Sequence, residues 1–341
     1  MRTILVTGGC GFIGSNFIRY ALQHHDDSIV NIDKLTYAGN LMNLADVEND
    51  PRYHFEKGDI TCEGDVDWVF RHHDPDIVVN FAAESHVDRS IMSAAPFVHA
   101  NVQGTQTLLD MSRRYGIARF VQISTDEVYG SLGPNEPAFT EQSPIQPNSP
   151  YAASKAAADM FVRAYHETYA LPTVITRCSN NYGPYQFPEK LIPLAIMQLC
   201  EHKKVPVYGD GLQIRDWLHV EDHCRGIWSA MDQGKLGQVY NFGGGCEVTN
   251  IDLVRQLCRF LVKPANSFEY VKDRLGHDRR YAMDYSLAKR ELGWVPSIPF
   301  YEGLEKTVCW YLNNYDWIEG IRTAEYIHYY QRQYGERMVT A

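Results

Sequence analysis

A short apolar strand, Arg2–Val6, leads directly into a glycine-rich loop, Thr7–Gly14, and then into a helical stretch that extends to about Leu22. Such a loop needs glycine where the turn is tight, where a pyrophosphate approaches the backbone, and where the helix packs closely on the strand. The free N–H groups and the positive end of the helix dipole attract the phosphates. This order of strand, loop and helix constrains the fold more than any other feature, because it predicts the first unit of a dinucleotide-binding sheet.

The next strand, Ser28–Ile32, ends in Asp33, which lies 19 positions after the last glycine of the loop. At that distance a carboxylate can accept hydrogen bonds from both hydroxyls of the adenosine ribose, and it would repel the 2′-phosphate of NADP. The sequence therefore predicts NAD as the cofactor.

Later strands also end in residues that suit a flat cofactor. A third strand near Tyr53–Phe55 leads to Gly58–Ile60, and a fourth, Ile77–Phe81, opens into the small residues Ala82–Ala83. Strand and helix patterns continue to alternate through Thr173–Arg177. We therefore expect an α/β protein, with a Rossmann doubly wound parallel sheet and a smaller α/β substrate-binding carboxyl-terminal domain.

The expected domains follow from this alternation. Residues 1–177 should form the NAD-binding domain, with later contributions from about 213–242. Residues 178–317 should bind the substrate, and Asn180–Pro184 should be a loop at the start of that domain. Residues 318–341 should form a helical tail whose tyrosines at 326, 329, 330 and 334 pack inward or face a partner.

A helix is predicted from Pro150 to about Tyr169, because Ser149 can cap its free amides and proline suits the first helical position. Tyr151 and Lys155 are four residues apart, so they share one face of this helix. Lowering the pKa of a tyrosine by about 3 units requires roughly 4 kcal/mol. A nearby lysine and a cationic nicotinamide would supply favourable charge.

Thr125, Asp126 and Glu127 follow a buried strand, Ala118–Ser124, at the sheet edge where open α/β proteins bind ligands. Adjacent residues of a strand point to opposite faces, so both carboxylates can serve one site only if the chain turns there. The following Tyr129–Ser131 segment favours a turn. Oxidation alone needs no such acid–base pair, so the pair indicates a second chemical step.

Seven segments carry a family resemblance, and they occur in the order TGGCGFIGSNF, NFAAESHVDRS, STDEVYGSL, NSPYAASKAAADM, TRCSNNYGPYQFPEKLIPL, YGDGLQIRDWLHVEDH and DRLGHDRRY. In them the chain resembles the extended short-chain dehydrogenase/reductase family, specifically its nucleotide-sugar 4,6-dehydratases and most of all those that act on dTDP-glucose. The resemblance covers about Arg2 to Trp317. It implies a Rossmann domain that retains NAD, a smaller domain that holds the sugar nucleotide, and a homodimer.

The resemblance also implies a role for each matching residue. Tyr151 would be the base at the sugar 4-hydroxyl, Thr125 would hydrogen-bond that oxygen, and Lys155 would hold the nicotinamide ribose. Glu127 would remove the proton at C5, and Asp126 would protonate the departing 6-hydroxyl.

Two sets of binding residues complete the expected site. The cofactor contacts are Gly8, Gly11, Phe12, Ile13, Gly14, Asp33, Lys34, Asp59, Ile60, Ala82, Ala83, Tyr151, Lys155 and Asn181. The substrate contacts are His86, Thr125, Asn180, Glu189, Lys190, Pro206, Tyr208, Arg215, Asn250, Arg274 and His277. Arginine suits the diphosphate because its planar fork matches phosphate oxygens.

The implied reaction converts dTDP-glucose, or a close nucleotide-diphosphate-glucose, to the 4-keto-6-deoxy sugar nucleotide, as an NAD-dependent hydro-lyase of deoxysugar biosynthesis does. Oxidation at C4 makes the C5 proton removable, water leaves across C5 and C6, and hydride returns to C6. Three alternatives stay open. UDP-glucose could be the substrate, since one methyl group is worth only about 1 kcal/mol. A sugar-nucleotide 4-epimerase or decarboxylase would need no carboxyl pair, and a non-catalytic NAD-sensing scaffold would need no catalytic residues.

Charge and composition exclude several classes of binding partner. A formal net charge of −10 argues against binding to nucleic acid or to an anionic membrane. The sequence has no signal peptide and no apolar run long enough to span a bilayer, so we expect a cytoplasmic protein. Its eight cysteines form no Cys-x-x-Cys pair and suit reduced thiols. His219 and His223 have helical metal spacing but lack the zinc-protease order, so no metal is expected.

Overall fold

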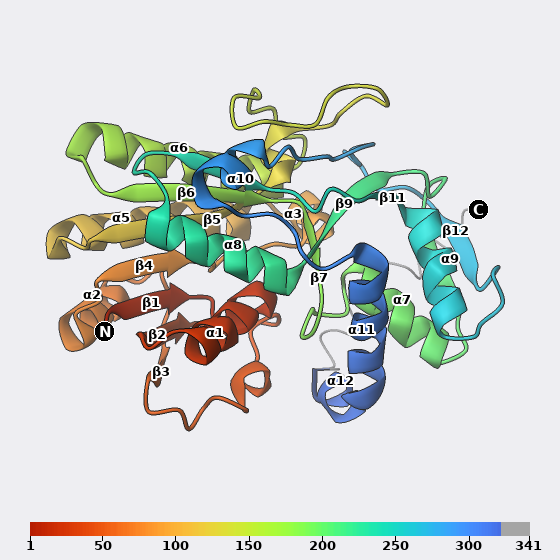
Figure 1. Ribbon diagram of the computed structural model, residues 1–341, viewed down its shortest axis with the longest axis horizontal. Coiled ribbons are helices and arrows are strands. Elements are labelled where there is room, and N and C mark those ends of the chain that lie inside the picture. Colours follow the sequence, from red (N-terminus) through yellow and green to blue (C-terminus); the bar gives the residue numbers. More distant parts are fainter. Residues whose placement is uncertain (322–341) are drawn as a thin grey trace.

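A seven-stranded parallel sheet forms the centre of the computed structural model, which describes residues 1–321 (Figure 1). Every neighbouring pair in this sheet is parallel. In spatial order its strands are β10 (Val239–Phe242), β6 (Thr173–Cys178), β5 (Arg119–Thr125), β4 (Ile77–Asn80), β1 (Thr3–Thr7), β2 (Ser28–Asp33) and β3 (Tyr53–Lys57). The expected Rossmann architecture is confirmed.

Helices cover both faces of this sheet, because the side chains of its strands alternate between two apolar clusters. On β1, Ile4 and Val6 belong to one cluster and Leu5 belongs to the other. The first cluster includes residues of α1 (Phe12–His24) and α8 (Val220–Gln233). The second includes residues of α2 (Glu63–His73), α5 (Gly104–Tyr115) and α6 (Pro150–Tyr169).

Short helical segments lie in the connections between the strands and longer helices of the large sheet. They are η1 (Leu41–Leu44), α3 (Val87–Met92), α4 (Ala95–Phe97), the π-helical η2 (Val98–Gln103), η3 (Asp126–Tyr129) and α10 (Ser286–Leu292). Helix α10 packs beside β10, so a segment far along the chain returns to the large sheet. Helix α8 and strand β10 both lie within residues 213–242. This is the segment that the sequence predicts to contribute to the NAD-binding domain.

The smaller part of the fold carries two further sheets, in the strand orders β11-β9-β7 and β12-β8. Its elements are β7 (Asn180–Tyr182), α7 (Leu191–Cys200), β8 (Val205–Tyr208), β9 (Ile214–His219), β11 (Glu247–Thr249), α9 (Asn250–Phe260), β12 (Phe268–Val271), α11 (Phe300–Asn313) and α12 (Tyr315–Ile321). The prediction of a loop over Asn180–Pro184 is wrong for its first three residues, which pair in parallel with β9. A three-residue strand has no readable period, and its partner lies far away in the sequence.

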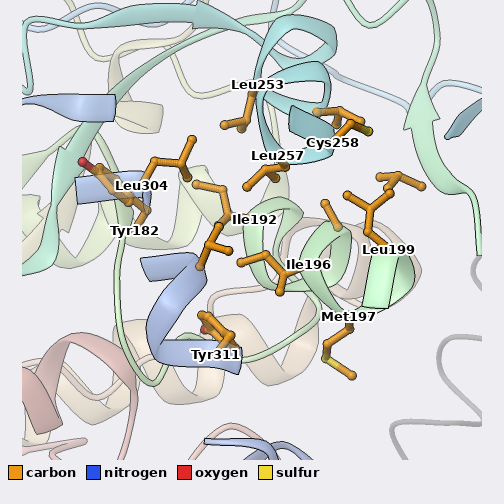
Figure 2. Packing of buried hydrophobic residues seen from close by; sticks show 14 of the residues in the cluster. Tyr182, Ile192, Ile196, Met197, Leu199, Leu253, Leu257, Cys258, Leu304 and Tyr311 are labelled. Carbon is orange, nitrogen blue, oxygen red and sulfur yellow. The ribbon is translucent and has the colours of Figure 1, made fainter. Parts of the chain in front are cut away.

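An apolar cluster between α7, α9 and α11 holds the smaller part together (Figure 2). Ile192 and Ile196 of α7 meet Leu257 of α9 and Leu304 of α11 in this cluster. Trp317, Ile318 and Ile321 of α12 belong to the same cluster, so packing continues past the expected boundary at residue 317. The tyrosines predicted to lie in a helical tail, at 326, 329, 330 and 334, fall outside the described residues. Over residues 1–321, no helix combines the length and apolar character needed to cross a bilayer.

Candidate active site

Two adjoining cavities open at the carboxyl ends of the strands. The larger, of about 330 Å³, is lined by the strand ends of the seven-stranded sheet. The smaller, of about 160 Å³, lies toward the elements of the smaller part. The walls of both cavities include Glu127, Asn180, Asn181, Gln186, Glu189 and Lys190, so the two cavities share a boundary.

The larger cavity gathers every residue that the sequence assigns to the cofactor. These are Gly8, Gly11, Phe12, Ile13, Gly14, Asp33, Lys34, Asp59, Ile60, Ala82, Ala83, Tyr151, Lys155 and Asn181. Thr125, expected at the substrate, also lines this cavity. The role of each of these residues in binding the cofactor stays a prediction.

At two positions of the glycine loop, a side chain would clash with backbone atoms. Gly8 has φ +67°, and a Cβ there would lie 2.7 Å from the Cα of Ala82. A Cβ at Gly14 would lie 2.5 Å from the carbonyl oxygen of Gly8. The backbone therefore packs against itself without side chains, which leaves a cradle at the amino end of α1 that suits a pyrophosphate.

Asp33 at the end of β2 fastens this loop. Its Oδ2 accepts a hydrogen bond from the Cys10 N–H at 2.9 Å, and its Oδ1 accepts one from the Leu35 N–H at 2.8 Å. Burial raises its pKa. Each carboxylate oxygen retains a second lone pair, so the same side chain can still accept ribose hydroxyls. The residues of the larger cavity thus fit NAD.

Tyr151 and Lys155 lie in the first turns of α6, whose predicted start is confirmed. Ser149 accepts a hydrogen bond from the Ala152 N–H at 3.1 Å and caps the helix. Lys155 Nζ donates to the Ile123 carbonyl oxygen at 2.6 Å. Both side chains are buried and line the larger cavity.

The pKa of Tyr151 depends on what surrounds its hydroxyl in the folded chain. Burial, followed by the charge of Glu127, raises it well above the ordinary value for tyrosine. Burial also lowers the pKa of Lys155. The expected lowering combined Lys155 with a bound cationic nicotinamide, so a lowered tyrosine pKa in the cofactor-bound enzyme stays a prediction. A cationic nicotinamide remains the source of favourable charge.

The chain turns immediately after β5, as the carboxyl pair requires. Thr125 caps the 3-10 helix η3 by accepting a hydrogen bond from the Glu127 N–H at 3.2 Å. Its hydroxyl also contacts Asp126 Oδ1 at 3.2 Å. Asp126 lines the larger cavity, whereas Glu127 lines both. One short turn therefore places Glu127 at the boundary between the cavities and Asp126 next to it in the larger cavity.

The two carboxyl groups have different environments. Asp126 is 2% exposed, and burial together with the Glu127 charge raises its pKa well above the ordinary value. Burial also raises the pKa of Glu127, but Arg274, Lys190 and Arg215 oppose that rise. Asp126 therefore holds its proton more strongly than an ordinary aspartate. This environment suits an acid that works beside a base.

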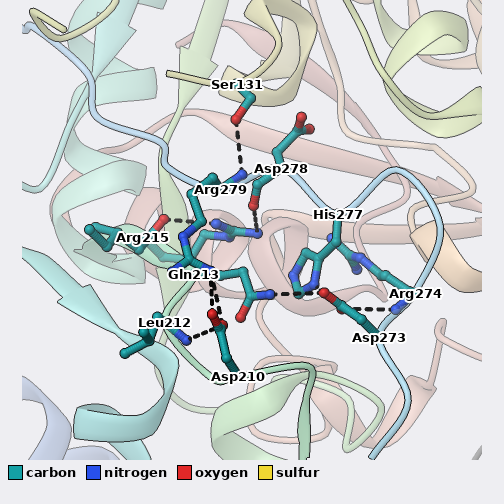
Figure 3. A network of polar contacts seen from close by, with 11 residues as sticks. Ser131, Asp210, Leu212, Gln213, Arg215, Asp273, Arg274, His277, Asp278 and Arg279 are labelled. Carbon is teal, nitrogen blue, oxygen red and sulfur yellow. Dashed lines mark hydrogen bonds and ion pairs between the residues drawn. The ribbon is translucent and has the colours of Figure 1, made fainter. Parts of the chain in front are cut away.

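The smaller cavity gathers the residues expected at the sugar nucleotide. They are His86, Asn180, Glu189, Lys190, Pro206, Tyr208, Arg215, Asn250, Arg274 and His277. A polar network arranges the part nearest Arg215 (Figure 3). Arg215 Nη2 donates to the Asp278 carbonyl oxygen at 3.0 Å, and His277 Nδ1 lies 2.6 Å from Asp273 Oδ1. Two guanidinium groups and a lysine at this cavity favour an anionic ligand.

Sequence reasoning missed one residue that lines a cavity and one that supports a cavity wall. Tyr281 lines the smaller cavity, and the Arg215 guanidinium lies 4.4 Å from its ring centroid. Its place in the DRLGHDRRY segment was the available signal. Asn101, in the π-helical η2, donates from Nδ2 to the Glu84 carbonyl oxygen and accepts from the Glu84 N–H. Asn101 thus supports the loop after β4. No spacing pattern in the sequence predicts this contact.

The paired histidines of the HVEDH segment serve local structure. His219 caps α8 by accepting a hydrogen bond from the Glu221 N–H at 3.3 Å, and His223 Nδ1 contacts Asn181 Oδ1 at 2.9 Å. Burial lowers their pKa values to about 4 and about 3. Within residues 1–321, no group of three or more His, Cys, Asp or Glu side chains could hold a metal ion.

Glu189 gives the site a pH-dependent stability. Burial raises its pKa from 4.5 to about 7, so ionisation of this carboxyl opposes folding. That cost is absent below pH 4.5 and fully present above about pH 7. We expect the neutral variant Glu189→Gln to be more stable than the parent by an amount that grows across this window to about 3 kcal/mol. Thermal melts of the ligand-free proteins from pH 5 to pH 8 measure it, and a difference independent of pH would contradict the assignment.

Comparisons with known proteins identify the same family as the sequence segments do. A family model described as GDP-mannose 4,6 dehydratase matches residues 5–307. The dTDP-glucose 4,6-dehydratase of Neisseria meningitidis serogroup B is 50% identical over an alignment 346 positions long, which covers 96% of this chain and 98% of that protein. A crystal structure of a dTDP-glucose 4,6-dehydratase from Streptomyces venezuelae, with NAD and dTDP bound, has a TM-score of 0.91 and 50% identity, and covers 94% of this chain and 100% of that one. The Bacillus anthracis enzyme of the same name, in complex with NAD, has a TM-score of 0.89 and 49% identity, with coverage of 94% and 100%.

Proposed function

The chain belongs to the GDP-mannose 4,6-dehydratase family, and from its similarity to dTDP-glucose 4,6-dehydratases we propose that it dehydrates dTDP-glucose to the 4-keto-6-deoxy sugar nucleotide. It is an NAD-dependent hydro-lyase. Bound NAD supplies the acceptor and later the donor of one hydride, so the reaction has no net redox change.

One observation carries this function. Of the carboxyl pair after β5, Glu127 lies in the walls of both cavities, and Asp126 lies beside it in the wall of the larger one. A sugar that spans the boundary would present its C4, C5 and C6 to the tyrosine and to both carboxyl groups. A 4-epimerase shares the glycine loop and the Tyr-x-x-x-Lys pair but has no use for two carboxyl groups there.

The residue roles extend this proposal. Tyr151 accepts the proton of the 4-hydroxyl, and Thr125 hydrogen-bonds the same oxygen. Lys155 orients the nicotinamide ribose. The 4-ketone makes the C5 proton removable, and Glu127 takes it while Asp126 gives a proton to the C6 oxygen as it leaves. Each acid or base step contributes about 10²- to 10⁴-fold.

Binding of the nucleotide is the task of the smaller cavity. Arg215, Arg274 and Lys190 offset the diphosphate charge, and Tyr208 offers a ring for the base. Local cations must outweigh the overall field of a chain whose formal net charge is −10. Residues 1–177 with parts of 213–242 would form the cofactor domain, and residues 178–317 would form the substrate domain.

The setting of the enzyme is also a proposal. We infer that it is a cytoplasmic homodimer that supplies deoxysugar biosynthesis, because its substrate and cofactor are intracellular metabolites and the family resemblance implies a dimer. Sedimentation velocity on the full chain tests the dimer, which a single species at the monomer mass of 39.0 kDa would contradict.

A side-by-side turnover assay with dTDP-glucose and UDP-glucose tests the reaction. We expect dTDP-glucose to give a product with the C6 methyl signal of a 6-deoxy sugar in proton NMR, without accumulation of NADH. Faster turnover of UDP-glucose would reassign the nucleotide. A product that keeps its 6-hydroxyl and is inverted at C4 would identify an epimerase, and NADH formed in proportion to product would exclude a closed redox cycle.

A further inference from the structure

Two loops from different parts of the fold contribute to the wall of the larger cavity. The first follows β2 and provides Lys34, Thr36, Ala38 and Gly39, and the second precedes α7 and provides Gln186, Phe187, Glu189 and Lys190. Much of the remaining wall consists of strand ends and helix starts, which are fixed by the sheet and by helix packing. Release of a bound dinucleotide is therefore easiest if these two loops separate.

The loops meet at Tyr37. Its hydroxyl donates a hydrogen bond to Glu189 Oε1 at 3.2 Å. Its ring packs edge-on against Phe187, with 5.6 Å between the ring centroids. The Arg89 guanidinium lies 3.7 Å from the centroid of the Tyr37 ring, and Arg89 Nε lies 3.9 Å from Glu189 Oε2. One tyrosine thus connects the two loops by a polar, an aromatic and a cation–π contact.

The remainder of each loop is anchored to segments other than the facing loop. On the first, Lys34 pairs with Asp59 at 2.6 Å, and the Asn40 N–H donates to the Cys10 carbonyl oxygen at 3.0 Å. On the second, Lys190 Nζ donates to the Ser85 carbonyl oxygen at 3.0 Å, and the Gln186 carbonyl oxygen accepts from the Tyr311 hydroxyl. With their ends held, the loops can part chiefly by breaking the Tyr37 contacts.

We propose that Tyr37 and Glu189, braced by Arg89, form a latch that retains NAD in the larger cavity between turnovers. The inference rests on the proposed function, in which the cofactor is regenerated in every cycle and gains nothing by leaving. Tyr37 acts here as a positioning residue, since none of the chemical steps requires it. Above about pH 7, where Glu189 is ionised, a hydrogen bond to its carboxylate corresponds to roughly 10-fold or more in an equilibrium or rate.

Tyr37→Phe tests the latch, because it removes the hydroxyl and keeps the ring beside Phe187 and Arg89. We expect bound NAD to dissociate about 10-fold faster or more, as measured by the NAD that remains with the protein at intervals after rapid gel filtration. At saturating NAD, turnover of dTDP-glucose should stay within about 2-fold of the parent. Tyr115→Phe is the matched control, because it removes a tyrosine hydrogen bond to Asp67 on the outer helices, and it should leave retention unchanged.

A second measurement separates the latch from a general loss of structure. If the hydroxyl acts through Glu189, Tyr37→Phe should add nothing to NAD release in a Glu189→Ala background. Equal NAD release by the parent and Tyr37→Phe, or the same acceleration in both backgrounds, would overturn the latch. These measurements use no sugar nucleotide. A parent enzyme that retains NAD but does not convert dTDP-glucose would count against the proposed reaction and not against the latch.

Discussion

Replacing Tyr151 by phenylalanine is expected to suppress both the formation of enzyme-bound NADH and the release of product. The tyrosine hydroxyl is the proposed acceptor of the 4-hydroxyl proton, and no later step can start before the 4-ketone exists. We expect turnover to fall by about 10²- to 10⁴-fold. Single-turnover absorbance of NADH with dTDP-glucose, together with product assay, measures both effects.

The matched control is Tyr301→Phe, which changes an exposed tyrosine of α11 and should leave turnover intact. Binding of NAD to the Tyr151→Phe variant should also persist, because the glycine loop and Asp33 are untouched. NADH formation at the parental rate in the variant would show that another group takes the proton.

Replacing Glu127 by glutamine should separate the two halves of the reaction. The amide is nearly isosteric but is not an effective base, so oxidation at C4 should proceed and elimination should stall. We expect part of the enzyme to accumulate NADH together with a 4-ketoglucose nucleotide, and product formation to fall by about 10²- to 10⁴-fold. Substrate deuterated at C5 should keep its label in the variant, whereas the parent should exchange it with solvent.

Glu48→Gln provides the control, since this exposed glutamate in the segment after η1 lies away from both cavities. It should turn over and exchange the C5 label as the parent does. Exchange at the parental rate in Glu127→Gln would mean that another group removes the C5 proton, and the assignment of the carboxyl pair would have to be abandoned.

Local patterns in the sequence were sufficient to predict much of the fold and the composition of the cavities. The strand, glycine loop and helix from Thr3 to His24 are each encoded by adjacent residues, and so is the Ser149–Pro150 start of α6. Asp33 could be placed because a strand end and a glycine loop fix its distance from the phosphates. All residues expected at the cofactor line one cavity, although their roles remain predictions.

Other features depend on residues that are distant in the sequence. Strand β7 exists because its three residues pair with β9, and no three-residue pattern could indicate that pairing. The Tyr37 contacts join residue 37 to residues 89, 187 and 189, so only the folded chain brings them together.

By itself, the sequence determined the Rossmann order of elements and the residue types at the ends of the strands, because strand period, helix capping and glycine spacing are local properties. Only the tertiary structure decided the electrostatics. Burial and neighbouring charges raise the pKa of Tyr151 and the pKa of Asp126 well above their ordinary values. They raise the pKa of Glu127 less, because cations oppose the rise. Such shifts depend on which groups surround a side chain after the sheet and the smaller part have packed together. For this reason the helical spacing of Tyr151 and Lys155 could predict a shared face, but it could not predict the pKa of the tyrosine in the folded chain.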